Sequence, residues 1–133
     1  MSRGIRNNNP GNIRIGEPWR GLSAEQTDHA FAQFEHATYG IRALCKILIT
    51  YQDRHGLKTV SKMINRYAPP SENDTGEYSR HIAAELGVTE REAVDVHDPV
   101  IMRGMLAGII LHENGSQPYG YEIDDGMTLA GIV

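Results

Sequence analysis

From residue 38 onward, apolar residues recur at intervals of three and four positions, which is the spacing of amphipathic helices. The first predicted helix ends before Gly56, and its apolar face comprises Ile41, Leu44, Cys45 and Leu48. A second helix is predicted from Val60 to Tyr67, with Thr59 as its N-cap. Because Cys45 lies on an apolar face, we interpret it as a core residue and not as a reactive thiol.

Capping residues predict two further helices. Asp74 and Glu77 have the spacing of a capping box, at the start of a helix that ends before Gly87. Thr89 and Glu92 repeat this spacing, and they predict a short fourth helix.

The fifth predicted helix is the most apolar one. Asp98 is a suitable N-cap and Pro99 suits the first helical position. Residues 100–111 are almost entirely apolar apart from Arg103, so this helix should be buried on most sides. Gly115 follows Asn114 and is expected to end the helix in a left-handed conformation.

A carboxylate closes the apolar stripe of this fifth helix. Met102, Leu106 and Ile110 follow one another at intervals of four, and a further step of three reaches Glu113. Partial burial and the negative end of the helix macrodipole both favour the protonated form of this carboxyl group. A general acid needs such a form to protonate a departing glycosidic oxygen. The alternative is that Glu113 simply points to water from a frayed last turn.

The first 38 residues differ from the rest because turn residues interrupt every apolar piece. Here we predict loops and a short β-hairpin, with strands at residues 12–15 and 30–34. The chain is therefore expected to form one domain, with a loop and hairpin lobe at 1–38, a helical body at 39–115 and a tail at 116–133. The sequence leaves open whether the tail packs on the body or forms a flexible end.

The composition excludes several kinds of site. Thirteen Lys and Arg against 17 Asp and Glu give a net charge of −4, and the positive charges are scattered, so we expect no nucleic-acid partner. One cysteine and six dispersed histidines match no metal-site pattern, and we expect no metal or cofactor. Apolar runs are too short for a signal peptide or a membrane span, so neither is expected.

Three segments resemble the lysozyme superfamily, especially lytic transglycosylases and bacterial glucosaminidases. GIILHENG at residues 108–115 resembles the catalytic-glutamate helix of these families. NNPGNI at 8–13 with FAQF at 31–34 is similar to the Asn/Gly segment and aromatic hairpin that follow that helix. Residues 64–78 resemble the later part of the substrate groove, where a tyrosine faces the glycan. In those families the glutamate helix comes first, so the resemblance implies a circularly permuted chain.

The resemblance implies a fold and an activity. The fold would be a mainly helical α+β lysozyme-like domain with about five helices and an N-terminal hairpin lobe. Its substrate would be the peptidoglycan glycan strand, and Glu113 would act as general acid and base at the bond between N-acetylmuramic acid and N-acetylglucosamine. In a lytic transglycosylase-type reaction this glutamate suffices, because the muramyl 6-hydroxyl attacks the anomeric carbon.

The resemblance also implies a set of substrate-binding residues, comprising Tyr78, Asn73, Thr75, Asn12, Gln33 and Trp19. Four of them have a structural alternative: the Tyr78 ring could pack in the core, Asn73 and Thr75 could serve a helix start, and Trp19 could anchor a loop. Asn12 and Gln33 are placed by the resemblance only. A hydrolase would need a second carboxylate, for which the candidates are Glu17, Glu25, Asp28, Glu35, Glu72 and Asp74.

The whole pattern also resembles small virion-associated or prophage-encoded phage proteins that carry a lysozyme-like domain. This resemblance implies a protein carried by the virion, with virion proteins as partners, or delivered to the bacterial cell envelope. Two other functions stay open. One is a non-enzymatic virion or cell-wall-binding component that keeps the fold, and the other is an intracellular helical adaptor that docks a partner through residues 121–133.

Overall fold

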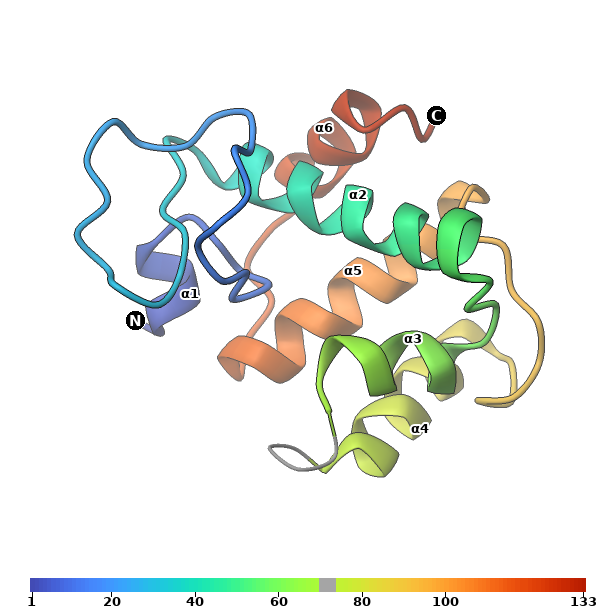
Figure 1. Cartoon of the computed structure of the whole chain (residues 1–133). Coiled ribbons are helices and arrows are strands. Elements are labelled where there is room, and N and C mark those ends of the chain that lie inside the picture. Colours follow the sequence, from blue (N-terminus) through green and yellow to red (C-terminus); the bar gives the residue numbers. More distant parts are fainter. Residues whose placement is uncertain (70–73) are drawn as a thin grey trace.

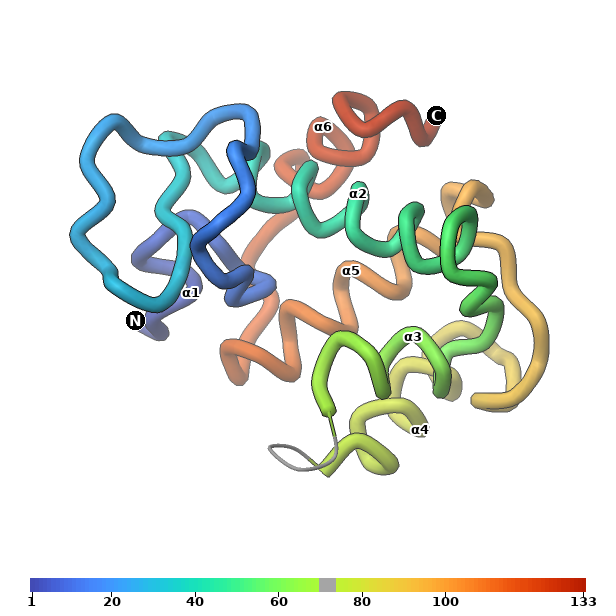
Figure 2. Tube along the Cα trace, viewed as in Figure 1, coloured from blue at the N-terminus to red at the C-terminus, as the bar shows by residue number. Residues whose placement is uncertain are grey.

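The computed structural model describes residues 1–69 and 74–133, and this part of the chain is mainly helical (Figure 1, Figure 2). Its helices are α1 (Arg3–Arg6), α2 (Ala37–His55), α3 (Val60–Tyr67), α4 (Thr75–Leu86), α5 (Pro99–Asn114) and α6 (Tyr121–Leu129). The N-terminal loops lie at one end of the molecule, and α3 and α4 lie at the other. None of the helices in the described part is long and apolar enough to cross a membrane.

Four of the predicted helices are confirmed as α2, α3, α4 and α5, because their end signals are local. The N-cap side chains of Thr59, Asp74 and Asp98 each accept a hydrogen bond from a backbone N–H of the first turn. Left-handed glycines end three of the helices, with φ of 66° at Gly56, 71° at Gly87 and 74° at Gly115.

The predicted fourth helix at Thr89 and Glu92 is wrong. The backbone N–H of Thr89 donates to Oε1 of Glu92 at 3.0 Å, so half of the capping box forms. The chain nevertheless makes only a turn there, and Ala93 then pairs with Thr59 in an isolated antiparallel bridge. One satisfied cap does not offset the cost of nucleating a helix that has no further turn to propagate.

The core surrounds α5, which runs through the middle of the helical body (Figure 1). Its apolar stripe is fully buried, as we predicted for the fifth helix. The stripe comprises Met102, Met105, Leu106, Ile109 and Ile110. The apolar face of α2 is also fully buried, and burial raises the pKa of its Cys45 thiol to about 12. The prediction that Cys45 is a core residue is therefore confirmed.

The tail forms α6 and packs closely along α2. Ile123 and Met127 are buried, and Gly126 faces the middle of the contact. A Cβ atom at Gly126 would lie 2.7 Å from Cγ2 of Ile41 and 3.1 Å from the carbonyl oxygen of Thr38. A glycine at this position therefore allows the two helices to approach, and the apolar side of the tail is used inside the domain.

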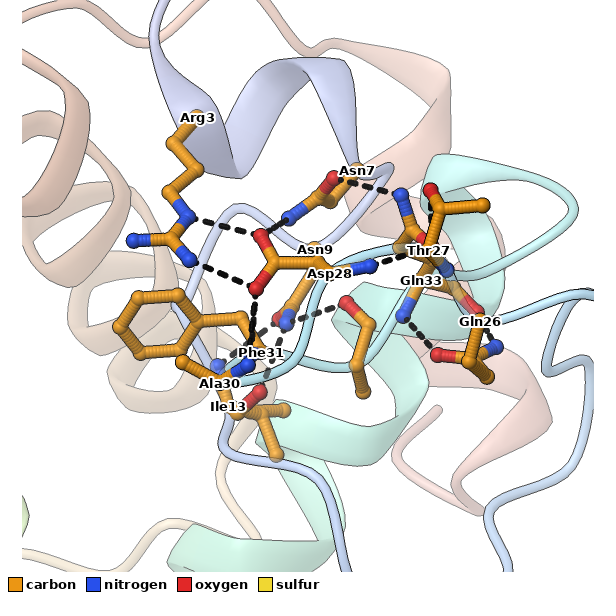
Figure 3. A network of polar contacts seen from close by, with 11 residues as sticks. Arg3, Asn7, Asn9, Ile13, Gln26, Thr27, Asp28, Ala30, Phe31 and Gln33 are labelled. Atoms are coloured by element: carbon orange, nitrogen blue, oxygen red, sulfur yellow. Dashed lines mark hydrogen bonds and ion pairs between the residues drawn. The ribbon is translucent and has the colours of Figure 1, made fainter.

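The predicted hairpin reduces to isolated bridges, between Arg14 and Phe31 and between Leu22 and Phe34. The two predicted strand segments do pair, because the backbone N–H of Ile15 donates to the carbonyl oxygen of Ala30 at 3.1 Å and that of Ala32 donates to the carbonyl oxygen of Ile13 at 2.9 Å. The fully buried Asn9 reinforces this pairing (Figure 3): it donates to the carbonyl oxygens of Ile13 and Ala32, at 2.8 and 2.9 Å, and accepts from the backbone N–H of Ile13 at 3.0 Å. The segments are thus held by two backbone hydrogen bonds and one buried side-chain amide, and not by a longer regular ladder.

An ion pair ties the short helix α1 to this lobe (Figure 3). Asp28 accepts two hydrogen bonds from the guanidinium of Arg3, at 2.6 and 2.7 Å, and one from Nδ2 of Asn7 at 3.0 Å. It also accepts from the backbone N–H groups of Ala30 and Phe31, at 2.9 and 3.0 Å. The Arg3 guanidinium and these further donors hold the pKa of the Asp28 carboxyl well below its usual range.

The Asp28 ion pair predicts an acid-sensitive lobe. A carboxyl group whose pKa is lowered by folding stabilises the folded state above its unfolded pKa of about 4, and this contribution is lost as the pH falls below that value. We expect Asp28→Asn to lower the free energy of unfolding at pH 7, and the difference from wild type to shrink towards pH 2.5. Urea unfolding followed by circular dichroism measures this, with the exposed Asp125→Asn as control. A deficit that stays constant with pH would contradict the ion-pair account.

Candidate active site

Glu113 lies in the last turn of α5, half-buried, at the end of the apolar stripe. Its carboxyl group accepts two hydrogen bonds from distant parts of the chain. Nδ2 of Asn12 donates to Oε1 at 3.1 Å, and the hydroxyl of Tyr78 donates to Oε2 at 3.2 Å. The two oxygens of Glu113 are therefore oriented by the N-terminal segment on one side and by α4 on the other.

Asn12 reaches Glu113 because the backbone turns sharply beside it. Asn12 has a φ of 53°, a left-handed conformation that asparagine tolerates better than most residues. The preceding Gly11 accepts a hydrogen bond from the hydroxyl of Tyr67 through its carbonyl oxygen. A Cβ atom at Gly11 would lie 2.6 Å from that same hydroxyl, so only glycine permits this approach.

Asn114 fastens the N-terminal segment to the end of α5. Its Nδ2 donates to the carbonyl oxygens of Pro10 and Ile110, at 2.7 and 2.9 Å, and its Oδ1 accepts from the hydroxyl of Ser2 at 2.6 Å. A Cβ atom at Gly4 would lie 2.6 Å from this Oδ1. The sequence marks Asn114 only as a helix-end residue and does not predict this role, because Pro10 and Ser2 are more than a hundred positions away.

Tyr78 is both a core residue and a neighbour of Glu113, which are the two roles that the sequence left open for it. Its side chain is 1% exposed, and its ring stacks on the ring of His112 with centroids 3.9 Å apart. Burial raises the pKa of Tyr78 far above its usual value, and the charge of Glu113 raises it further. The phenol is thus a core ring whose hydroxyl stays protonated and acts as a hydrogen-bond donor to Glu113.

A pocket of about 550 Å³ opens beside Glu113 and Asn12. Aromatic rings and two arginines line much of it, and burial raises the pKa of both Tyr51 and Tyr67. The Arg66 guanidinium lies 5.6 Å from the centroid of the Tyr51 ring, and Arg14 lies 5.1 Å from that of Phe31. The sequence did not predict Arg66 and Tyr51 as pocket residues. Helical periodicity indicates which residues share one face of a helix, but it does not indicate where a pocket forms between elements.

Among the described residues that line this pocket, Glu113 is the only carboxylate. Of the other carboxylate candidates, Asp28 is bound by Arg3, Glu17 lines two other pockets, and Asp74 caps α4. Glu72 lies outside the described residues.

Three of the remaining substrate-binding candidates, Thr75, Gln33 and Trp19, are engaged away from Glu113 in the structure. Thr75 is buried and its hydroxyl donates to the carbonyl oxygen of Ala68 at 2.7 Å. The side-chain amide of Gln33 is bonded within the N-terminal lobe, to Asn7 among others (Figure 3). Trp19 lines a separate pocket, and Asn73 lies outside the described residues. Over residues 1–69 and 74–133, no three His, Cys, Asp or Glu side chains gather as a metal site.

The bonds of Asn114 predict a large effect on stability. We expect Asn114→Ala to lower the free energy of unfolding by about 2–4 kcal/mol, because it removes three hydrogen bonds and leaves the Pro10 carbonyl without its donor. Asn65→Ala is the matched control, since this exposed side chain bonds only to Ser61 one turn away. Chemical unfolding of both variants measures the difference, and equal losses would contradict the role of Asn114 as the fastening residue.

Comparison with known proteins places the chain in a family. No family model matches it. It is 36% identical over 126 residues to Protein P5 of Pseudoalteromonas phage PM2, in an alignment that covers 91% of this chain and 76% of the phage protein. Identity of this extent reaches across the N-terminal lobe and the helical body together, so the chain belongs to the family of Protein P5 of phage PM2.

Proposed function

We propose that the protein cleaves the peptidoglycan glycan strand between N-acetylmuramic acid and N-acetylglucosamine, with Glu113 as general acid and base. The observation that carries this proposal is the setting of Glu113. One half-buried carboxyl group ends an apolar helix, is oriented by Asn12 and Tyr78, and borders a pocket of about 550 Å³. A held carboxyl group at the edge of a pocket is suited to moving a proton to and from a bound substrate.

The lining of the pocket supports a lytic transglycosylase-type reaction. The protonated carboxyl group gives its proton to the glycosidic oxygen as the bond from that oxygen to the anomeric carbon breaks. The carboxylate then takes the proton of the muramyl 6-hydroxyl, whose oxygen bonds to the anomeric carbon and closes a 1,6-anhydro ring. Both steps use one carboxyl group, whereas most hydrolases need two. Glu113 alone among the described lining residues can supply it.

Aromatic and cationic side chains give the pocket a chemistry that suits a glycan with acidic substituents. Tyr51 and Phe31 offer ring faces that can pack against sugar carbons. Arg14 and Arg66 can donate hydrogen bonds to the carboxylates of the stem peptides of the substrate. Asn12 and Tyr78 act as positioning residues, because they bond to Glu113 itself.

A circularly permuted lysozyme-like fold accounts for the order of the segments. Ser2 donates to Asn114 at 2.6 Å, so the N-terminal segment lies beside the end of the glutamate helix. A chain opened at that point would keep the contacts of the standard order while placing the glutamate helix late in the sequence. Kinship with a phage protein supports association with a phage virion. Action on the bacterial envelope follows only from the activity proposed for Glu113.

The decisive test is the loss of the carboxyl group at position 113. We expect wild-type protein to release 1,6-anhydro-muropeptides from isolated peptidoglycan sacculi, detected by mass spectrometry. Glu113→Gln should reduce this release by about a hundredfold or more while the fold is retained, because general acid–base catalysis contributes about 10²–10⁴-fold. Glu85→Gln, an exposed glutamate of α4, is the control and should remain active.

Other products would identify other functions. Products with reducing ends would indicate a muramidase that uses a second carboxylate. If neither protein releases soluble products while both are folded by circular dichroism, the enzymatic proposal fails. A non-enzymatic virion or wall-binding component would then explain the fold and the phage kinship.

Removing the Tyr78 hydroxyl tests its positioning role. We expect Tyr78→Phe to keep the ring stack on His112 and to lower kcat by about tenfold with little change in KM, because one donor to the catalytic carboxyl group is lost. Steady-state release of soluble muropeptides measures both constants. An unchanged kcat would assign Tyr78 to the core alone.

A further inference from the structure

A second pocket lies beside Trp19 and shares no lining residue with the pocket at Glu113. Its volume is about 460 Å³, and its lining comprises Glu17, Pro18, Trp19, Arg20, Arg42, Lys46 and Thr50. The first four belong to the N-terminal lobe and the last three to α2. The pocket therefore lies where the lobe meets the helical body.

The α2 residues of this pocket form one stripe. Arg42, Lys46 and Thr50 are spaced four residues apart, so they lie above one another on the helix surface. Ile47 and Tyr51 lie one position further along, about 100° around the helix, and they line the pocket at Glu113. The two pockets thus use neighbouring faces of α2.

Positive charge is concentrated at this second pocket. It is lined by three cations, Arg20, Arg42 and Lys46, and by one carboxylate, Glu17, so its formal charge is 3 − 1 = +2 in a chain of net charge −4. None of these four side chains forms an ion pair with any residue in the described ranges. Arg20 lies 5.8 Å from the centroid of the Tyr39 ring, so the charge of all three cations is left without an anionic partner in the described part of the chain.

Two buried donors in the pocket lack acceptors. Nε1 of Trp19 and Nε of Arg42 are both shielded from solvent, and neither has a hydrogen-bond partner among the described residues. A buried N–H group without an acceptor is costly, so native proteins rarely leave one unsatisfied. An indole N–H and a guanidinium N–H are donors only, so a ligand that reaches them after the Trp19 or Arg42 side chain turns towards the pocket must supply acceptor oxygens.

We propose that this pocket binds an oxyanion group, phosphate or carboxylate, of a larger ligand. Arg42 and Lys46 supply positive charge from α2, and Arg20 supplies it from the lobe. Arginine suits such oxyanions because its guanidinium donates two parallel hydrogen bonds. The volume of about 460 Å³ leaves room beyond the anion for a further part of the ligand. This inference rests on the pocket alone and is independent of the activity proposed for Glu113.

Trp19 makes the test direct, since the chain contains one tryptophan and its indole N–H gives a single resonance from this pocket. Inorganic phosphate and acetate are titrated separately into ¹⁵N-labelled full-length protein, with sodium chloride holding the ionic strength constant. We expect a saturable shift of the Trp19 indole resonance with at least one of the two anions. Saturation by phosphate alone assigns a phosphate-bearing ligand, and saturation by acetate assigns a carboxylate-bearing one.

Variants distinguish a specific binding site from nonspecific attraction of anions to positive charge. Arg42→Gln and Lys46→Gln should each raise the apparent Kd about tenfold or more, because each removes a charged donor. The exposed Lys62→Gln on α3 removes the same charge elsewhere and should leave the Kd unchanged. Absence of a saturable shift in folded wild-type protein would overturn the proposal. So would equal binding by wild type and a folded Arg42→Gln or Lys46→Gln variant.

Discussion

The contact between residues 2–12 and the last turn of α5 is the constraint on which the candidate active site depends. Consecutive residues of a helix point about 100° apart, so Glu113 and Asn114 reach different parts of the same segment. Asn114 holds the backbone at Pro10, and this brings Asn12 within 3.1 Å of the Glu113 carboxyl group. Loss of the Asn114 hydrogen bond to Pro10 would therefore free Asn12 from Glu113 as well as remove a structural contact. Stability of the lobe and geometry of the site are therefore coupled.

Local signals account for what the sequence predicted well. Thr59, Asp74 and Asp98 cap their helices through hydrogen bonds that span two or three residues, and such bonds depend on neighbouring sequence alone. The N-terminal lobe depends instead on bonds between distant segments. Asn9 reaches Ala32 across 23 positions, and no periodic pattern in the sequence predicts that an asparagine side chain will reinforce the pairing there. The predicted strand segments do pair through backbone hydrogen bonds, but as a short bridge that a side-chain amide supplements.

The residues of the candidate site also differ in whether short-range or long-range contacts define their roles. Glu113 could be found because it closes an apolar stripe on one helix, a pattern of short range. Tyr78 came from the resemblance, and its contact with Glu113 joins residues 35 positions apart. Asn114 and Arg66 were missed because their roles arise only when the lobe and the helices come together. The hydroxyl of Thr75 bonds to Ala68, and the amide of Gln33 bonds to Asn7 across 26 positions, so both are engaged within the fold instead.

The local distribution of charge depends on folding and cannot be derived from the composition. The chain is acidic and its basic residues are dispersed, which argues against an extended basic surface. Folding nevertheless gathers Arg20 with Arg42 and Lys46 around one pocket, because the lobe folds back over α2. Electrostatic attraction of a ligand depends on charges within about 10 Å, the screening length at moderate salt, and not on the total for the chain. A protein with a net negative charge can thus contain a cationic pocket. The charge of a ligand must complement the charge of the pocket and not the net charge of the chain.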